Sequence, residues 1–327
     1  MAIPIIPGSP SIIEVTTFAR LHMGFFDLNG NLGRRFGSIG LSLDSPYTKL
    51  QARKHAGLSV QGPSAPRAEK LARIILSALQ IKEGIKIELK QAIPEHSGLG
   101  SGTQMALAVG TAISKLYDIK LTARDIAGFT SRGARSGIGL GTFDLGGVIV
   151  DGGRGPDTIT PPVISHLTFP AAWTILLIFD QSAQGVHGAQ EVEAFKQLAE
   201  FPETIAADLC RRVLMQALPA LAETNLRSFG QAIRALQEAT GDYFSPVQGG
   251  RYASQAVAEV LNYLSGNNVE CLGQSSWGPT AFAVFADETQ SQLCLDQLQS
   301  RYDGTALRFQ LCKGLNQGSV SRFLNDA

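Results

Sequence analysis

The amino-acid sequence predicts an α+β protein that is divided into two domains. Its first half is rich in glycine and carries strand-like alternation of β-branched residues, whereas much of its second half has the apolar spacing of helices. The composition changes around Pro161 and Pro162, two prolines that would interrupt a strand ladder. We therefore predict an N-terminal domain at 1–165 and a C-terminal domain at 166–327, each long enough to bury a core.

The first half is expected to contain strands and helices in turn. Alternation predicts strands at 12–17 and 85–90, and helical spacing predicts helices at 65–79, 105–117 and 122–132. Thr122 and Asp125 have the spacing of an N-terminal capping box, which supports the start of the third helix. Glycines then return through 133–155, and the linker is expected near 155–170.

The second half is expected to form one sheet with helices on one of its faces. The expected elements are a buried strand at 173–180, several helices within 205–266, a strand, loop and strand at 269–285, a helix at 289–301 and a last strand at 306–312.

The charge balance excludes a general attraction to nucleic acid or to an anionic membrane surface. The chain has 28 basic and 28 acidic side chains, so an anionic ligand must be captured locally. The four cysteines are scattered and predict buried thiols in a reducing compartment. The N-terminal residues lack the pattern of a secretion signal, and no apolar run is long enough to span a bilayer. We expect a cytoplasmic protein with neither nucleic acid nor membrane as partner.

A glycine-rich loop at 96–104 leads directly into the predicted helix at 105–117. Closely spaced glycines allow several N–H groups to face one point, and the following helix adds the positive end of its dipole. Phosphate or pyrophosphate is the natural ligand of such a loop. No lysine follows the last glycine, so this is not a Walker A loop, and an ordinary tight turn between strand and helix is the alternative.

Five segments, in order along the chain, resemble known proteins. They are 20–30 (RLHMGFFDLNG) with Gly33-Arg34 and Gly40-Leu41, 94–104 (PEHSGLGSGTQ), 132–139 (RGARSGIG) leading to Phe143 and 146–153 (GGVIVDGG), 185–188 (GVHG) with Glu191 and Phe195, and 273–280 (GQSSWGPT). The second and the last are similar to glycine-rich motifs of the GHMP kinases, a superfamily that includes galactokinase, homoserine kinase and mevalonate kinase. The other three resemble one branch, the β-ribofuranosylaminobenzene 5′-phosphate synthases of methanopterin biosynthesis.

One departure from the kinase pattern bears on the chemistry. Kinases of the mevalonate type carry S-G-x-D, whose aspartate assists the attacking hydroxyl. This chain has Ser136-Gly-Ile-Gly139 instead, and a glycine cannot orient or deprotonate a hydroxyl. Asp144 would have to supply a carboxylate from a shifted position, so a small-molecule kinase of the same fold remains the alternative. A binding protein without catalysis is the third hypothesis.

The resemblance implies a fold, a reaction and a set of partners. The fold would pair an N-terminal domain like ribosomal protein S5 with a C-terminal ferredoxin-like α/β sandwich. The reaction would condense phosphoribosyl pyrophosphate with a para-substituted benzoate, 4-aminobenzoate or 4-hydroxybenzoate, and release pyrophosphate and CO2. Mg²⁺ is implied by the diphosphate substrate, and a homodimer is the default expectation for a soluble enzyme.

The matched motifs supply candidates for each task of that reaction. The phosphate-binding candidates are Gly98, Leu99, Gly100, Ser101, Gly102, Thr103 and Gln104. The catalytic candidates are Arg20, His22, Asp27, Arg132, Asp144, His187 and Glu191. The substrate-binding candidates are Arg34, Arg135, Gln274, Ser275, Ser276 and Trp277, and Asp151 is the candidate metal ligand. Guanidinium groups suit phosphate and carboxylate oxygens, imidazoles titrate near neutrality, and an indole suits stacking on an aromatic acid.

Several of these residues also have structural interpretations that the sequence leaves open. Asp27 and Asp151 are of a type that closes its own turn, Trp277 would also suit a core, and an arginine beside glycines is often a surface ion pair.

Overall fold

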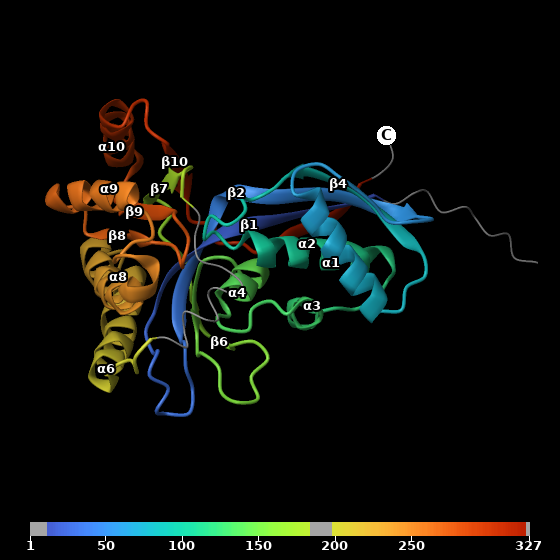
Figure 1. Cartoon of the computed structure of the whole chain (residues 1–327), viewed down its shortest axis with the longest axis horizontal. Helices are drawn as coiled ribbons and strands as arrows, with labels where there is room; N and C mark the ends of the chain where they lie inside the picture. Colours follow the sequence, from blue (N-terminus) through green and yellow to red (C-terminus); the bar gives the residue numbers. More distant parts are fainter. Residues whose placement is uncertain (1–11, 184–197, 325–327) are drawn as a thin grey trace, which may run out of the picture.

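A computed structural model describes residues 12–183 and 198–324 of the chain as two sheets with helices packed against them (Figure 1). The first sheet has seven strands, ordered β11-β1-β2-β4-β3, with β5 paired to β2 and β6 paired to β5. Its strands are β1 (Ile12–Phe25), β2 (Ser38–His55), β3 (Ser59–Gln61), β4 (Gly84–Gln91), β5 (Val148–Asp151), β6 (Val163–Leu167) and β11 (Val320–Leu324).

Strand β1 carries two irregularities that flank two of the predicted site residues, Arg20 and His22. Its antiparallel register with β2 shifts between Phe18 and Arg20 and again between His22 and Gly24. Such irregularities bend a strand and re-aim its side chains, and they are frequent beside active sites. Arg20 and His22 therefore lie on a short regular piece of strand between two bends.

Helices from the first half of the chain pack against the first sheet (Figure 1). They are α1 (Ala65–Ala78), α2 (Ser101–Leu116), α3 (Ala123–Thr130) and α4 (Ile138–Asp144). The predicted capping box is confirmed, since the side chain of Thr122 accepts from the N–H of Asp125 and the Asp125 carboxylate accepts from the N–H of Thr122. The helix ends earlier than predicted because Ser131 adopts a left-handed conformation, with φ of 53°.

The second sheet has four antiparallel strands in the order β10-β7-β9-β8. Its strands are β7 (Thr174–Asp180), β8 (Cys271–Gln274), β9 (Ala281–Phe285) and β10 (Leu307–Lys313). The helices of this half are α6 (Glu203–Arg212), a π-helical turn η1 (Val213–Ala217), α7 (Leu218–Ala222), α8 (Leu226–Gln248), α9 (Gln255–Gly266) and α10 (Glu288–Arg301). All of the elements predicted for this half are present.

One hydrophobic core joins the two halves. Leu21 and Met23 of β1 belong to the same buried cluster as Phe229, Ile233 and Leu236 of α8. Both Figure 1 and the shared core place β1 against the C-terminal helices. A site that uses residues from both halves is therefore held rigidly.

The predicted division at residue 165 does not coincide with a break in the structure. Strand β6 spans that residue within the first sheet, and β11, from the end of the chain, pairs with β1 in the same sheet. The C-terminal segment thus contributes to the N-terminal half, which a linear boundary cannot express.

Two further observations concern the cysteines and the length of the helices. All four cysteines are free; Cys271 and Cys312 are buried, whereas Cys210 and Cys294 are partly exposed. Among the described helices, none combines the length and the apolar character needed to cross a membrane.

Candidate active site

The glycine-rich loop forms a strained entry into helix α2. Gly98 and Gly100 have φ of 79° and 83°, a region that favours glycine, and Gly100 caps the helix that begins at Ser101. In the described part of the chain, the N–H groups of Ser101 and Gly102 have no hydrogen-bond acceptor. These N–H groups and the helix dipole together favour a bound anion.

Contacts from both halves of the protein hold this loop in place. The guanidinium group of Arg20 and the Ser275 hydroxyl both donate to the carbonyl of Gly98, the latter at 2.9 Å. The backbone N–H of Arg20 donates to the carbonyl of Leu99 at 3.1 Å. A Cβ added to Gly98 would lie 2.3 Å from the Ser275 carbonyl oxygen. The loop is therefore packed directly on the late glycine-rich segment that contains Ser275.

Two more arginines stand at the start of α2. Arg67, from the first turn of α1, donates to the Ser101 hydroxyl at 3.3 Å and pairs with Glu95 at 2.8 Å. A Cβ added to Gly102 would lie 3.2 Å from Nη1 of Arg132. Desolvation, with the charge of Arg67, lowers the pKa of Arg132. The Arg132 guanidinium has no hydrogen-bond or ion-pair partner within the described chain, whereas Arg67 is already paired with Glu95, and both side chains lie beside the start of α2.

Arg67 is a candidate site residue that sequence reasoning missed. It lies in a helix that the sequence predicts, but nothing in its local pattern shows that the helix begins beside the loop. Only the packing of α1 against α2 brings its side chain to Ser101.

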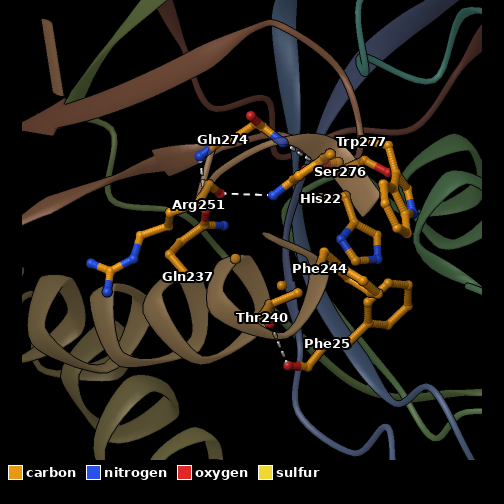
Figure 2. A pocket seen from close by; sticks show the side chains of 12 residues that line it. His22, Phe25, Gln237, Thr240, Phe244, Arg251, Gln274, Ser276 and Trp277 are labelled. Carbon is orange, nitrogen blue, oxygen red and sulfur yellow. Dashed lines mark hydrogen bonds between the residues drawn. The ribbon is translucent and has the colours of Figure 1, made fainter. Parts of the chain in front are cut away.

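A small pocket lies beside the loop, between β1, α8 and the segment after β8 (Figure 2). Its lining residues are His22, Gly24, Phe25, Gln237, Thr240, Gly241, Phe244, Gln248, Arg251, Gln274, Ser276 and Trp277. The His22 and Phe25 rings are 4.5 Å apart between centroids, and the Phe244 and Trp277 rings are 4.1 Å apart. Aromatic rings therefore form one part of the wall, and glycines and polar side chains form the rest.

His22 is buried in this pocket as a neutral imidazole. Burial, followed by the charge of Arg20, lowers the pKa of His22 to about 3. Its Nε2 atom has no hydrogen-bond partner in the described structure. The backbone carbonyl of His22 accepts from the N–H of Ser276 at 3.2 Å, which fixes the strand against the late loop.

Two of the three glutamines that line the pocket, Gln237 and Gln274, are hydrogen-bonded to the backbone of the protein. Gln237 donates to the carbonyl of Met23 at 2.7 Å and accepts from the N–H of Gln274 at 2.8 Å. The Gln274 side chain accepts from the N–H of Ala253 at 2.7 Å and donates to the carbonyl of Ser276 at 2.9 Å. Gln274 and Ser275, predicted to bind substrate, thus shape the site through contacts with the protein.

The predicted metal ligand Asp151 is used inside the protein. Its carboxylate accepts from Ser38, from Ser136 at 3.1 Å, and from the N–H groups of Gly137 and Gly153, both at 2.9 Å. Burial raises the pKa of Asp151, although these four donors act in the opposite direction. Among the described residues, no group of three histidine, cysteine, aspartate or glutamate side chains is arranged to hold a metal. The described side chains thus do not form a ready magnesium site.

Asp27 and Arg34 also have structural contacts. The Asp27 carboxylate accepts from the N–H groups of Asn29 and Gly30, at 2.9 and 3.1 Å, and so closes a turn. The Arg34 guanidinium donates to the carbonyls of Gly152 and Gly153, at 2.8 and 2.7 Å. Arg34 therefore joins two loops, and the structure does not bring it to the glycine-rich loop.

The position of the missing kinase carboxylate lies against the glycine-rich loop. A Cβ added to Gly139 would be 3.1 Å from Cγ2 of Thr103, and Nε2 of Gln104 donates to the Gly139 carbonyl at 2.8 Å. Asp144 is at the opposite end of α4, roughly 7 Å further along the helix axis. Burial raises the pKa of Asp144, but the structure does not bring this residue to the loop, contrary to a shifted catalytic role.

The remaining candidates are placed less fully. Arg135 is partly buried in the turn that precedes α4, and Leu99 is buried in the shared core. His187 and Glu191 lie outside the described residues.

The fold and the loop define the class of protein. Residues 67–150 match the family model described as GHMP kinases N terminal domain, and residues 217–304 match the one described as GHMP kinases C terminal. Within that class, the chain belongs to the family of β-ribofuranosylphenol 5′-phosphate synthases. It is 35% identical to the synthase of Methanocaldococcus jannaschii and 33% identical to that of Archaeoglobus fulgidus, over 84% of this chain in both cases. The matches cover 89% and 88% of those proteins.

Solved structures confirm the GHMP fold across the whole chain. A homoserine kinase from Cytophaga hutchinsonii superposes with a TM-score of 0.69 at 17% identity, covering 98% of this chain and 100% of the kinase. A mevalonate diphosphate decarboxylase from Staphylococcus aureus gives 0.66 at 14% identity, covering 96% of this chain and 98% of the other. At such identities the likeness concerns the fold alone.

Proposed function

We propose that this chain is a β-ribofuranosylphenol 5′-phosphate synthase, which condenses phosphoribosyl pyrophosphate with a para-substituted benzoate. The observation that carries the proposal is its similarity to synthases of that name over most of both chains. Because the names of these relatives specify a phenol, 4-hydroxybenzoate is the first acceptor to test and 4-aminobenzoate the second.

The proposed reaction breaks two bonds, forms one carbon–carbon bond, and needs no oxidant or reductant. The bond between C1′ of the ribose and the diphosphate oxygen breaks, and pyrophosphate leaves with the electron pair. The ring carbon that bears the carboxylate forms a bond to C1′. The bond from that carbon to the carboxylate then breaks, its electrons restore the aromatic ring, and CO2 leaves. The protein must therefore stabilise a departing diphosphate and exclude water from an electron-poor ribosyl carbon.

The anion site supplies the first of these requirements. Arg67 and Arg132 flank the unpaired N–H groups at the start of α2, and their charges match a diphosphate. The contact of Arg20 with the Gly98 carbonyl keeps the loop in the conformation that presents these groups. In this proposal Arg67 and Arg132 bind the leaving group, and Arg20 positions the loop.

Magnesium, a homodimer and a cytoplasmic location are further parts of the proposal. Mg²⁺ commonly binds through substrate phosphates with one or two carboxylates, so it would enter with phosphoribosyl pyrophosphate rather than occupy a protein cage. We assign no step of the reaction to the metal.

The kinase alternative shares the fold and the loop but lacks its carboxylate. Gly139 stands against Thr103 where the S-G-x-D motif would place an aspartate, and Asp144 lies at the other end of α4. A kinase would therefore need its base from elsewhere.

The deciding experiment measures both leaving groups at once. Purified protein is mixed with magnesium, phosphoribosyl pyrophosphate and either 4-hydroxybenzoate or 4-aminobenzoate, and pyrophosphate and CO2 are quantified. Equal release of both products supports the synthase. Release of neither pyrophosphate nor CO2, together with consumption of ATP in the presence of a small alcohol, would contradict the synthase and support the kinase alternative.

A further inference from the structure

The pocket beside the loop contains a buried nitrogen atom that has no hydrogen-bond partner in the described structure. His22 is 3% exposed, and its Nε2 atom has no hydrogen-bond partner in the described structure. A buried polar group without a hydrogen-bond partner destabilises the protein, so a ligand that pairs with it gains binding free energy. Figure 2 shows the imidazole among the side chains of Phe25, Phe244 and Trp277.

The charge of the pocket does not suit a carboxylate. The guanidinium group of Arg251 is paired with both carboxylate oxygens of Asp242, at 2.7 and 2.8 Å. His22 stays neutral because burial lowers its pKa to about 3. The side-chain amides of Gln237 and Gln274 are hydrogen-bonded to groups of the protein itself. A small neutral group is therefore a better ligand than an anion.

The size of the pocket sets the size of that group. Its volume is about 30 Å³, whereas a single water needs roughly 10–15 Å³ by the same kind of measure. A hydroxyl or amino group with the adjoining edge of a ring fits such a space. A complete benzoate does not, so most of the ring must remain outside.

The pocket and the anion loop share one wall. The N–H of Ser276 donates to the His22 carbonyl at 3.2 Å, while the neighbouring Ser275 hydroxyl donates to the Gly98 carbonyl at 2.9 Å. Arg20, two residues before His22 on β1, contacts that same carbonyl. A ring anchored in the pocket by one end would thus be held beside the loop that is proposed to bind the diphosphate.

We propose that this pocket is the subsite for the para substituent of the aromatic acid, with Nε2 of His22 as the hydrogen-bond partner of its hydroxyl group. The carboxylate end of the ring then stays outside, where the new bond forms. The proposal rests on the proposed function and adds the residue that recognises the substituent. In this proposal, the size of the para substituent and its hydrogen bond to His22 determine which benzoate the protein accepts.

Tryptophan fluorescence tests the location of the ring. The chain has two tryptophans, and Trp173 packs in the core against Phe169 and Phe229. In a Trp173→Phe variant, Trp277 reports alone, and we expect 4-hydroxybenzoate to quench it saturably. The matched control is Trp277→Phe, in which the remaining Trp173 should not respond.

A substituent cycle tests His22 itself. In the wild-type protein, 4-hydroxybenzoate should bind about 5-fold or more tightly than benzoate, the gain expected of one neutral hydrogen bond. In His22→Phe, which keeps a buried ring without the nitrogen, this preference should fall to about 1-fold. A preference unchanged by the substitution overturns the role of His22. Should His22→Phe fail to fold, binding to the wild-type protein decides: 4-ethoxybenzoate, whose substituent exceeds the pocket, should bind far more weakly than 4-hydroxybenzoate, and equal binding of the two overturns the pocket.

The outcomes separate this inference from the proposed function. Release of pyrophosphate and CO2 without quenching of Trp277 and without loss of the preference in His22→Phe overturns the pocket and leaves the synthase intact. Quenching and the His22-dependent preference without product release support the pocket and overturn the synthase.

Discussion

Replacing Arg132 by glutamine should weaken catalysis while sparing or improving the stability of the free protein. The Arg132 guanidinium is beside Gly102, has no partner in the described chain, and has its pKa lowered by desolvation and by the charge of Arg67. Removing one of two neighbouring cations relieves the repulsion between them. Removing a charged donor from a bound diphosphate costs about 1.5–3 kcal/mol. That cost corresponds to a fall of about 10- to 150-fold in kcat/KM for phosphoribosyl pyrophosphate.

The assay combines steady-state kinetics with urea unfolding of the free protein. Arg34→Gln is the matched control, because the Arg34 guanidinium donates to the carbonyls of Gly152 and Gly153 and does not reach the loop. It should lower the free energy of unfolding and leave the KM for phosphoribosyl pyrophosphate within about twofold. If Arg132→Gln instead destabilised the protein and left kcat/KM unchanged, Arg132 would be a structural residue and the anion site would be wrong.

Three further predictions concern the loop and the pocket. Gly98→Ala should abolish activity and lower the melting temperature, because the new Cβ would lie 2.3 Å from the Ser275 carbonyl oxygen at φ of 79°; Gly128→Ala, with open space around its Cβ, should be neutral or stabilising, and equal behaviour of the two would contradict this. Arg67→Met should raise the KM for phosphoribosyl pyrophosphate about tenfold or more and leave that for the benzoate within about twofold, whereas the reverse pattern would remove Arg67 from the anion site. Because the pKa of His22 is about 3 in the folded protein, against its ordinary value of 6.5, the unfolded chain takes up a proton that the folded one does not as pH falls below 6.5. His22 should therefore cost the wild-type protein about 1.4 kcal/mol of stability per pH unit below 6.5, and urea titrations of His22→Phe at several pH values should lack this slope.

The parts of the fold that follow from local pattern were predictable. The helix at 65–79, the capping box at Thr122 and the strands and helices of the second half all have clear periodicity or capping chemistry. Strand β2, by contrast, includes Gly40 and Pro46 and has residues buried on both faces, so it lacks simple alternation. Strand β11 pairs with β1 across almost the whole length of the chain, a contact that no local pattern specifies.

The candidate site also has parts that local sequence pattern predicts and parts that it does not. The glycines of the loop and Arg132 lie in motifs with a local signature, and the structure brings them together. Asp151 and Arg34 lie in similar motifs but contact the protein's own backbone and hydroxyl groups. A sequence motif shows that a residue type is needed at a position. Only the contacts of that residue in the structure show whether it is needed to bind a ligand or to stabilise a turn. Arg67 reaches the site through the packing of two helices, so the sequence holds no local sign of its role.

The glycine at 139 connects this geometry to the proposed chemistry. A kinase needs a carboxylate near its phosphate loop because the attacking hydroxyl must lose a proton. In the proposed condensation the nucleophile is a ring carbon that bears a carboxylate, and the group that departs from it is CO2 rather than a proton. No base is then required at position 139, where the backbone instead accepts a hydrogen bond from Gln104 and packs against Thr103. Two requirements remain. Positive charge must hold the diphosphate, and the arginines at the start of α2 supply it. The far end of the ring must be fixed, and the pocket at His22 offers a place for it. The same loop geometry thus suits diphosphate departure without the kinase base.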